Sequence, residues 1–314
     1  MRISDFLSLK WKEEESPLIQ PPPGSPIIAD PSFLGPEDTP DKRWHLFAHS
    51  IWRIHHYVSD NGVAWQKQEL VVRHAMRAFV LKHNDTFYLY YERYRPFQIL
   101  FTWITTIAWK SLIEVRTSKD LLTWSASRTV LAPTLPWHKS KYGNSVSNPC
   151  VLKSDTKFVL YYSASLTLVP DCGFCEPEYI GRAASDDPCG PFTPEEHPLI
   201  SHNPEDEWCN LCAGSIKVLH LEDGFIGLQN GIYLDKGRSG SAILLLSSAD
   251  GIHFKRAQNE PIIRPTSGWK RSHVYACDAR YVKALDRFHL YFNARDNWHW
   301  TRGREVIGLA HSSK

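Results

Sequence analysis

The segment PIIADPSFL at residues 26–34 is a short apolar run with one carboxylate, Asp30, near its centre. Its length and apolar character predict a β-strand. A proline inside a strand forfeits a ladder hydrogen bond, so Pro31 favours a sheet edge or the start of a strand. Because a carboxylate is costly to bury, we expect Asp30 to point from this strand into a wet cavity. An Asp-Pro turn in front of a strand remains the alternative from this segment alone.

Turns of one type recur along the chain at intervals of roughly 60–65 residues. Each begins with serine, continues with Asp or Asn, and leads into an aromatic residue, as expected of a turn between two strands. They occupy residues 59–65, 118–124, 185–192 and 248–254. The spacing exceeds propeller repeats of about 40–50 residues, but it is compatible with blades that carry loop insertions.

Alternating aromatic and aliphatic residues predict a second set of strands between these turns, at residues 43–48, 86–91, 157–162, 224–229 and 287–292. Each is preceded by a first strand, at Asp30 and at residues 77–79, 148–149, 213–215 and 278–280. Five units of up to four strands predict an all-β fold, a five-bladed β-propeller. We expect one domain over residues 1–314, with blades at roughly 26–72, 76–131, 146–200, 212–259 and 273–312.

The fifth unit lacks a fourth strand at the C-terminus. Residues 7–12 precede the first blade, and we expect them to supply this strand and so to close the last blade. Such closure removes an open sheet edge. The alternative is a disordered N-terminal tail.

Composition and charge indicate which kinds of ligand and partner to expect. Aromatic residues make up 12% of the chain, which is typical of β architectures and of carbohydrate sites. The net charge is +2, without a long run of one sign, so we expect no nucleic-acid partner. Residues 1–10 lack the apolar core of a signal peptide, and the apolar run at 97–109 is too short and polar to cross a bilayer. We therefore expect a cytoplasmic protein without a membrane partner.

The chain resembles the five-bladed propeller glycoside hydrolases of family 43 and its relatives in families 32, 62, 117 and 130. The resemblance is carried by Asp30-Pro31, by Asn148-Pro149 and by the serine-led turns, and it covers essentially the whole chain. It implies a glycosidase that cleaves a glycosidic bond in an oligo- or polysaccharide by carboxylate acid/base catalysis in the central funnel. It also implies that catalysis requires no cofactor.

In family 43 an Asp on blade one is the general base, an Asp on blade three tunes the acid, and a Glu on blade four is the acid. An inverting glycosidase needs its acid and base roughly 6.5–9.5 Å apart, with room for water. Asp30 matches the base. Asn148 stands where the tuning Asp would be and carries no charge, and residues 212–215 offer no Glu. We expect Glu178 to be the proton donor, with Glu176 and Asp278 as the next candidates.

Other polar residues are expected in the funnel as substrate-binding groups. These are Arg77, Asn148, Glu92, His273, Asp278 and Arg280. Two structural alternatives stay open: Glu92 could form a salt bridge with Arg93 or Arg95, and Asp278 could pair with Arg280 beneath the funnel.

Two other functions remain open. Because the usual acid is missing, the chain could be a non-catalytic carbohydrate-binding propeller. Arg77, with His273 and Arg280, could instead bind inorganic phosphate, as basic residues do in family 130 phosphorylases.

Two Cys-x-x-Cys pairs suggest a structural zinc ion. Paired knuckles of thiolates usually bind zinc in a tetrahedral site, and four thiolates leave no position open for water. The four ligands would be Cys172, Cys175, Cys209 and Cys212. Disulfides or separate buried thiols are the alternatives. We expect Cys150, Cys189 and Cys277 to lie in the core.

A long apolar insertion separates the second and third strands of blade two. Residues 94–111 hold eight large apolar side chains, and so apolar a loop must be covered by something. We expect it to form a homo-oligomer contact, with a lid over the sugar as the alternative.

Overall fold

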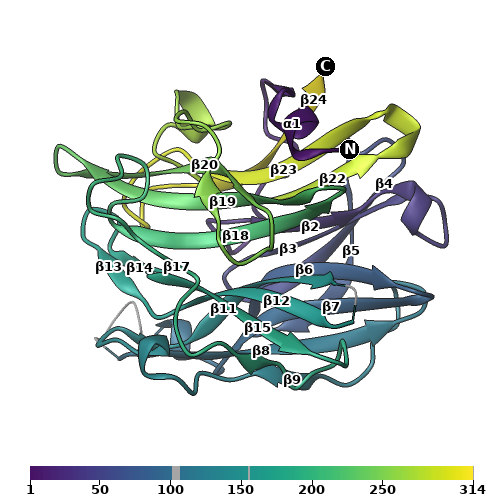
Figure 1. The fold of residues 1–314 in the computed structure, drawn as a ribbon, viewed down its shortest axis with the longest axis horizontal. Helices are drawn as coiled ribbons and strands as arrows, with labels where there is room; N and C mark the ends of the chain where they lie inside the picture. The colour runs from purple at the N-terminus through teal and green to yellow at the C-terminus, as the bar shows by residue number, and fades with distance from the viewer. Residues whose placement is uncertain (101–106, 155, 314) are drawn as a thin grey trace.

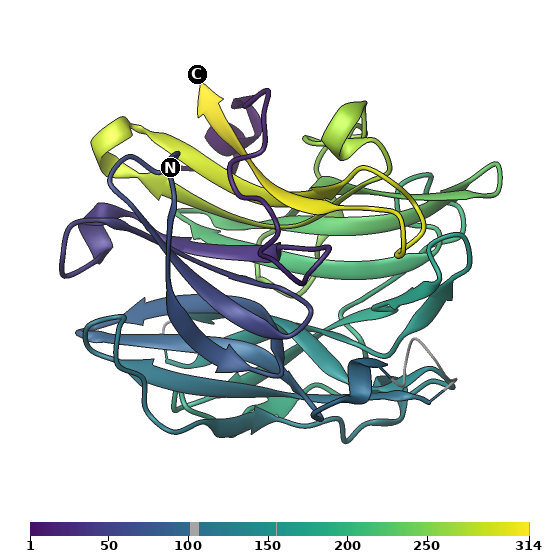
Figure 2. The same ribbon diagram turned by 180° about the vertical axis from the view of Figure 1, so that it is seen from behind.

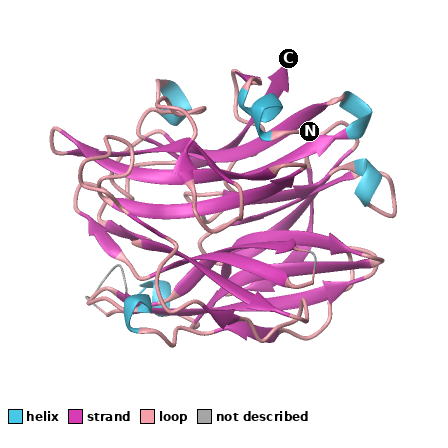
Figure 3. Cartoon of the chain, viewed as in Figure 1, coloured by secondary structure: helices cyan, strands magenta, loops and turns pink. Residues whose placement is uncertain are grey.

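The computed structural model describes all residues except 101–106, 155 and 314. Strands dominate these residues, as the cartoon shows (Figure 3). The helical segments are short: α1 (Ile3–Leu7), η1 (Pro36–Asp38), η2 (Pro136–His138), η3 (Gly268–Lys270) and η4 (Lys283–Leu285). In the part of the chain that the structure describes, no helix is both long and apolar enough to span a membrane.

Five sheets form the blades of a β-propeller, as predicted (Figures 1 and 2). Blade one contains β2 (Ala29–Leu34), β3 (Trp44–His49), β4 (Arg53–Ser59) and β5 (Gln66–Arg73). Blade two contains β6 (Ala75–His83), β7 (Thr86–Tyr94), β8 (Trp109–Ser118) and β9 (Arg128–Leu131), and β10 (Gly143–Asn144) pairs with β8 in parallel.

Blade three contains β11 (Val146–Lys153), β12 (Phe158–Ala164), β15 (Tyr179–Ser185), β16 (Thr193–Pro194) and β17 (Ile200–Ser201). A separate hairpin of β13 (Thr167–Val169) and β14 (Phe174–Glu176) is inserted between β12 and β15. Blade four contains β18 (Cys212–Leu221), β19 (Gly224–Asp235), β20 (Arg238–Ser248) and β21 (Lys255–Arg256).

Blade five contains β22 (His273–Val282), β23 (Arg287–Arg295) and β24 (Glu305–Ser313), and it is completed by β1 (Lys10–Glu13). β1 runs antiparallel to β24, so the N-terminal segment closes the last blade as expected. The closing strand lies slightly further along the chain than residues 7–12, because Ile3–Leu7 forms α1 instead. Phe6 of this helix is fully buried and packs edge-on against Phe288, which anchors the segment.

The recurrent serine-led turns connect the third and fourth strands of their blades. The hydroxyl oxygen of Ser59 accepts the backbone N–H of Gly62 at 3.0 Å, and the side chain of Asn61 accepts two further backbone N–H groups. Ser118 and Ser248 repeat the same arrangement in blades two and four. These side chains satisfy backbone donors that a tight turn leaves unpaired, which explains why the pattern marks the blades so clearly.

Every innermost strand carries a β-bulge about two to four residues after its start. The register shifts occur between Ala29 and Ser32, Met76 and Phe79, Ser147 and Cys150, Cys212 and Ser215, and Val274 and Cys277. A bulge leaves one residue outside the ladder and re-aims its side chain. In four blades a bulge residue has the left-handed backbone conformation: Asp30 (φ 49°), Arg77 (φ 55°), Asn148 (φ 48°) and Gly214 (φ 69°).

Gly214 leaves no room for a side chain at the bulge of blade four. A Cβ atom at this position would lie 1.9 Å from the backbone oxygen of Asn230, so a side chain cannot fit without moving the neighbouring strand. A carboxylate at this position is therefore excluded.

Replacing Gly214 by alanine should destabilise the fold more than the same change at another glycine of similar φ. Gly237 (φ 79°) is the matched control, because nothing lies within 4 Å of the Cβ that would be added there. Gly237→Ala should cost about 1–2 kcal/mol for the left-handed backbone, and Gly214→Ala about 2–4 kcal/mol because the clash adds to that cost. Urea denaturation of both variants measures the difference. Equal losses would show that the close approach of Asn230 costs nothing.

Candidate functional site

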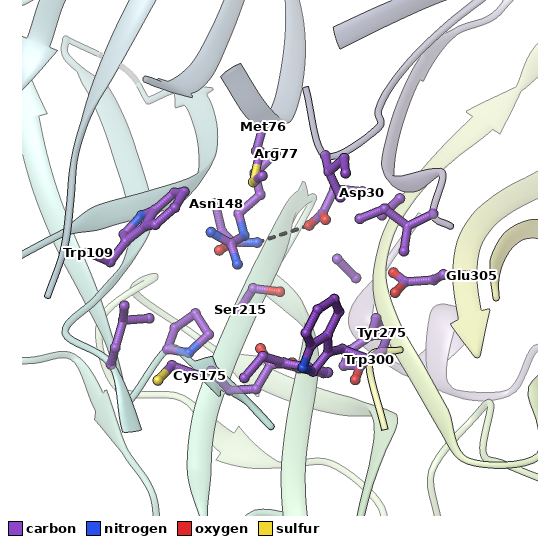
Figure 4. Close-up of a pocket in the computed structure, with 18 of the residues that line it drawn as sticks. Asp30, Met76, Arg77, Trp109, Asn148, Cys175, Ser215, Tyr275, Trp300 and Glu305 are labelled. Atoms are coloured by element: carbon purple, nitrogen blue, oxygen red, sulfur yellow. Dashed lines mark hydrogen bonds between the residues drawn. The ribbon is translucent and has the colours of Figure 1, made fainter. Parts of the chain in front are cut away.

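The bulge residues surround a cavity of about 690 Å³ in the centre of the propeller. Side chains of all five blades line it, and Figure 4 shows Asp30, Arg77, Asn148 and Ser215 directed toward its interior. Three carboxyl side chains lie in the wall, those of Asp30, Glu176 and Glu305.

Asp30 is held by partners from three elements. Its Oδ2 lies 2.8 Å from His49 Nε2, and its Oδ1 accepts a hydrogen bond of 3.0 Å from Asn148 Nδ2 (Figure 4). Its backbone N–H donates to Asn293 Oδ1 at 3.0 Å. Each carboxylate oxygen can accept two hydrogen bonds and has one here, so lone pairs remain for a water molecule or a substrate hydroxyl.

Both ring nitrogens of His49 lie beside an oxygen atom. Its Nδ1 lies 3.0 Å from the backbone oxygen of Ser50, which can only accept, and its Nε2 faces the carboxylate of Asp30. Burial alone would raise the pKa of Asp30, but the hydrogen bond and charge of His49, with the charges of Arg77 and Lys217, lower it below its ordinary value. Asp30 is therefore ionised at neutral pH.

Glu176 has the opposite electrostatic environment. It is the last residue of β14 and only 9% exposed, and it lines the cavity. Burial raises its pKa to about 8; Arg77 opposes this rise, while the carboxylates of Glu305 and Asp30 add to it. Glu176 is therefore largely protonated at neutral pH.

Glu305 lies across the cavity from Asn148 and Arg77 (Figure 4). It is the first residue of β24 and accepts hydrogen bonds from Asn293 and, at 3.5 Å, from Arg295. Burial raises its pKa, and the charge of Arg295 works against that rise. Asn293 links two of the carboxyl-bearing residues, since its amide oxygen accepts from Asp30 and its amide nitrogen donates to Glu305.

Both arginines of the cavity are paired with a carboxylate. Arg77 forms a salt bridge with the fully buried Glu92, which also accepts a hydrogen bond of 2.8 Å from Trp109 Nε1. Burial would lower the pKa of Arg77, but the charges of Glu92, Asp30 and Glu176 raise it, so it stays charged. Arg295 is bound to Glu305 and to backbone oxygens of the loop before β24.

The structure brings together only part of the predicted site. Asp30, Glu176, Arg77 and Asn148 line the cavity. Glu178 does not line it, and its carboxylate accepts a hydrogen bond of 3.2 Å from Ser165 instead. Glu92 lies behind Arg77 and pairs with that residue rather than with Arg93 or Arg95.

Three further candidates lie outside the cavity wall. Asp278 forms a salt bridge with Arg280 at 3.0 Å, which was the structural alternative for this residue. It also accepts hydrogen bonds from the hydroxyl of Ser32 and from the backbone N–H of Phe33. His273 is buried against Ser239, at 3.2 Å between Nε2 and Oγ.

The zinc hypothesis is not supported. Among the described residues, no group of three or more His, Cys, Asp or Glu side chains could hold a metal ion, and all seven cysteines are free. Cys172 Sγ lies 3.3 Å from Ser239 Oγ, whereas Cys209 donates to the backbone oxygen of Cys212 and accepts from Gln229. Burial raises the pKa of Cys175 and of Cys209 to about 11. In this structure the thiols pack as small apolar groups.

The insertion of blade two contributes to the cavity wall. Ile99, Ile107 and Trp109 line the cavity, so part of the insertion faces the site. Residues 101–106 of the expected oligomer contact lie outside the described residues. The contact itself stays a prediction.

Several site residues were missed in the sequence. His49, Asn293 and Arg295 lie at the ends of predicted strands, where alternation does not reveal which groups face the funnel. Glu305 begins the third strand of blade five. The only feature of the sequence that could have indicated its place in the cavity was an acidic residue at the start of a predicted strand. Tyr275 follows the start of β22 and lines the cavity, and its buried hydroxyl has no hydrogen-bond partner among the residues that the structure describes.

Comparisons with known proteins agree on the fold. No protein-family model matches the sequence, and no curated protein matches it. Among solved structures, the catalytic domain of a family 62 α-L-arabinofuranosidase from Coprinopsis cinerea is similar with a TM-score of 0.70 at 14% identity, over 98% of both chains. A family 117 glycoside hydrolase from Zobellia galactanivorans has a TM-score of 0.62 at 14% identity, over 97% of this chain and 90% of that one.

A different activity occurs on the same fold. An N-acetylgalactosamine deacetylase from F. plautii, solved with blood group B trisaccharide, has a TM-score of 0.67 at 12% identity, over 96% of this chain and 95% of that chain. At such identities the similarity establishes the fold and leaves the activity to the residues of the site. The chain thus has the five-bladed propeller fold of the glycoside hydrolases that its sequence resembles.

Proposed function

We propose that the protein is a glycoside hydrolase with Asp30 as general base and Glu176 as general acid. One observation carries the proposal: two carboxyl groups line the same cavity, and their environments move their pKa values in opposite directions. Such a pair supplies one ionised and one protonated carboxyl group at neutral pH, which is what glycosidic cleavage needs.

The roles follow from these protonation states. Asp30 accepts a proton from a water molecule, whose oxygen forms the new bond to the anomeric carbon. Glu176 donates its proton to the glycosidic oxygen as the old bond breaks. Burial is the main reason why Glu176 holds its proton, and the negative charge of Glu305 adds to this effect, a contribution that the uncharged Asn148 cannot make.

Asn148 and Arg77 are proposed to position the substrate and the base. Asn148 orients Asp30 directly, and Arg77 faces the cavity beside it while Glu92 fixes its guanidinium group. The proposal takes Glu178, Asp278, Arg280 and His273 as support for the fold, because none of them lines the cavity.

Phosphate use has less support from the geometry. A phosphorylase needs cationic groups that are free to bind the anion, whereas Arg77 and Arg295 each already neutralise a buried carboxylate. An assay in which turnover requires inorganic phosphate would favour that function instead.

Substrates with different leaving groups should distinguish the general acid from the general base. On a panel of glycosides with poor alkyl leaving groups, Asp30→Asn and Glu176→Gln should each lose at least about 100-fold in kcat/KM. A 2,4-dinitrophenyl leaving group needs no proton, so Glu176→Gln should keep most of its activity on such a substrate while Asp30→Asn remains inactive. Glu178→Gln is the matched control, since this carboxylate stands two residues away but outside the cavity, and it should retain activity on both. Loss of activity in Glu178→Gln and not in Glu176→Gln would reverse the assignment.

The same pair predicts the pH dependence of kcat/KM. Glu176 has to be protonated, so activity should fall as the pH rises through about 8. Asp30 has to be ionised, and its lowered pKa should keep the acid limb below the ordinary range of an Asp side chain. A wild-type profile that stays flat to pH 10 would contradict the role of Glu176.

Glu176 should also weaken the fold at high pH, independently of any activity. Its folded-state pKa of about 8 lies above the ordinary value of 4.5, so the native state holds a proton that the unfolded chain releases. The free energy of unfolding is unaffected below pH 4.5 and falls between pH 4.5 and 8, by up to about 1.4 kcal/mol per pH unit. Glu176→Gln should therefore be stabilised relative to wild type at pH 8 and not at pH 4.5, as measured by chemical denaturation at both values. An equal difference at the two pH values would show that Glu176 is not held protonated.

A further inference from the structure

The cavity has two chemically different parts. Its base is polar and carries the carboxyl groups, the arginines and the asparagines described above. Another part of its wall is apolar and comes from blades one, two and three together with the hairpin β13–β14. The apolar side chains that the argument uses are Ile51, Met76, Ile99, Ile107, Leu166 and Leu168.

Most of the apolar wall is a packed structure and not a set of isolated side chains. Ile51, Met76, Ile99 and Leu166 belong to one buried cluster with Trp109 and Tyr94, and each of these four is less than 9% exposed. Ile107 completes the wall from the insertion and is 53% exposed. A wall held in this way exists before any ligand binds.

Trp109 presents an apolar surface as well. Its one polar atom, Nε1, already donates to Glu92 at 2.8 Å. Figure 4 shows Trp109 and Met76 on a different side of the cavity from Glu305 and Tyr275. The apolar and polar parts are therefore adjacent, and Glu92 connects them because it binds both Trp109 and Arg77.

A second sugar is a poor occupant of the apolar part. Aliphatic side chains offer no donors or acceptors, so sugar hydroxyls placed there would lose their hydrogen bonds to water without replacement, at a cost of roughly 1–3 kcal/mol each. Sugar rings bind mainly over aromatic faces, and the six wall residues named above are not aromatic. Two aromatic side chains of the cavity, Tyr275 and Trp300, lie on a different side from Trp109 and Met76 (Figure 4). An apolar group, in contrast, gains free energy from every part of its surface that leaves water.

From this two-part cavity we infer that the substrate is a glycoside with an apolar aglycone, whose sugar occupies the polar base and whose aglycone lies against the Ile51–Met76–Leu166 wall. The inference rests on the proposed glycosidase function and names its substrate class. The aglycone can be an alkyl chain, as in a glycolipid, or an aromatic ring system, because the same wall suits both.

Binding measurements test the aglycone without requiring turnover. Isothermal titration calorimetry with Glu176→Gln protein would compare methyl, n-hexyl and n-octyl β-D-glucosides, galactosides and mannosides, all below their critical micelle concentrations. A buried methylene is worth about a fourfold gain in affinity, so the n-octyl glycoside should bind more than tenfold tighter than the methyl glycoside. A parallel series with 2-naphthyl glycosides separates the two sources: a gain with chain length indicates a lipid aglycone, and a gain with naphthyl alone indicates an aromatic one.

Two variants test whether the gain in affinity with chain length comes from the apolar wall. Ile107→Ser and Leu168→Ser, made in the same background, change exposed or half-buried side chains that line the cavity, so the fold should tolerate them. Each should reduce the affinity for the n-octyl glycoside by about threefold to tenfold and leave that for the methyl glycoside unchanged. Leu122→Ser is the matched control, because Leu122 is 67% exposed and lies outside the cavity, and it should change neither affinity.

The outcomes separate this inference from the proposed function. Equal affinity for methyl, n-octyl and naphthyl glycosides, or an equal loss in Leu122→Ser and Ile107→Ser, overturns the apolar aglycone. Tighter binding of longer chains that is lost in Ile107→Ser supports it. If that binding is found while the wild-type protein cleaves no glycoside of the panel, the hydrolase proposal fails and the apolar subsite stands as a binding site.

Discussion

The bulge in each innermost strand is the constraint on which the site depends. A regular strand would direct alternate side chains above and below its sheet, and the funnel would receive only the edge of each blade. The bulge removes one residue from the ladder, and at positions 30, 77 and 148 the left-handed backbone turns that residue toward the propeller axis. Such conformations cost free energy for residues other than glycine, and they persist where the surrounding structure fixes them. The same bulge conformation thus directs three side chains, one from each of three blades, into the cavity.

The bulge also limits which side chains blade four can place in the cavity. Because Gly214 approaches the backbone of Asn230 so closely, no carboxylate can stand at the bulge of that strand. The hairpin β13–β14 carries Glu176, the proposed proton donor, to the cavity, and its tip is tied to neighbouring blades. Ser239 donates its backbone N–H to Asp171 at 2.9 Å, and Trp300 donates its backbone N–H to the oxygen of Cys172 at 3.0 Å. A proton donor on a loop needs such anchoring, since small displacements weaken acid catalysis.

The fold could be predicted from the sequence because its signals are local. Strand alternation and serine-led turns depend on neighbouring residues, and five alternating strands with four such turns leave few architectures. The position of Asp30 followed from the same repeats. The choice between Glu176 and Glu178 could not follow, because the two lie on either side of Pro177 where β14 ends, and only the path of the hairpin decides which one faces the cavity. The zinc prediction was not supported for a related reason. The Cys-x-x-Cys spacing keeps the two cysteines of one pair close together. Whether the two pairs meet depends on loops whose paths the sequence does not determine.

Closure of blade five by β1 has a consequence for the order of events during synthesis. Glu13 pairs with Ala310, so β1 is synthesised long before its partner strand β24 and can pair only when blade five has been made. Until then, Phe6 and the edge of β1 have no native surface to cover them, and contacts so distant in sequence form slowly. The ring of blades is therefore completed last at its N-terminal end. A nascent chain of this protein has to keep that segment from pairing with another chain until β24 emerges.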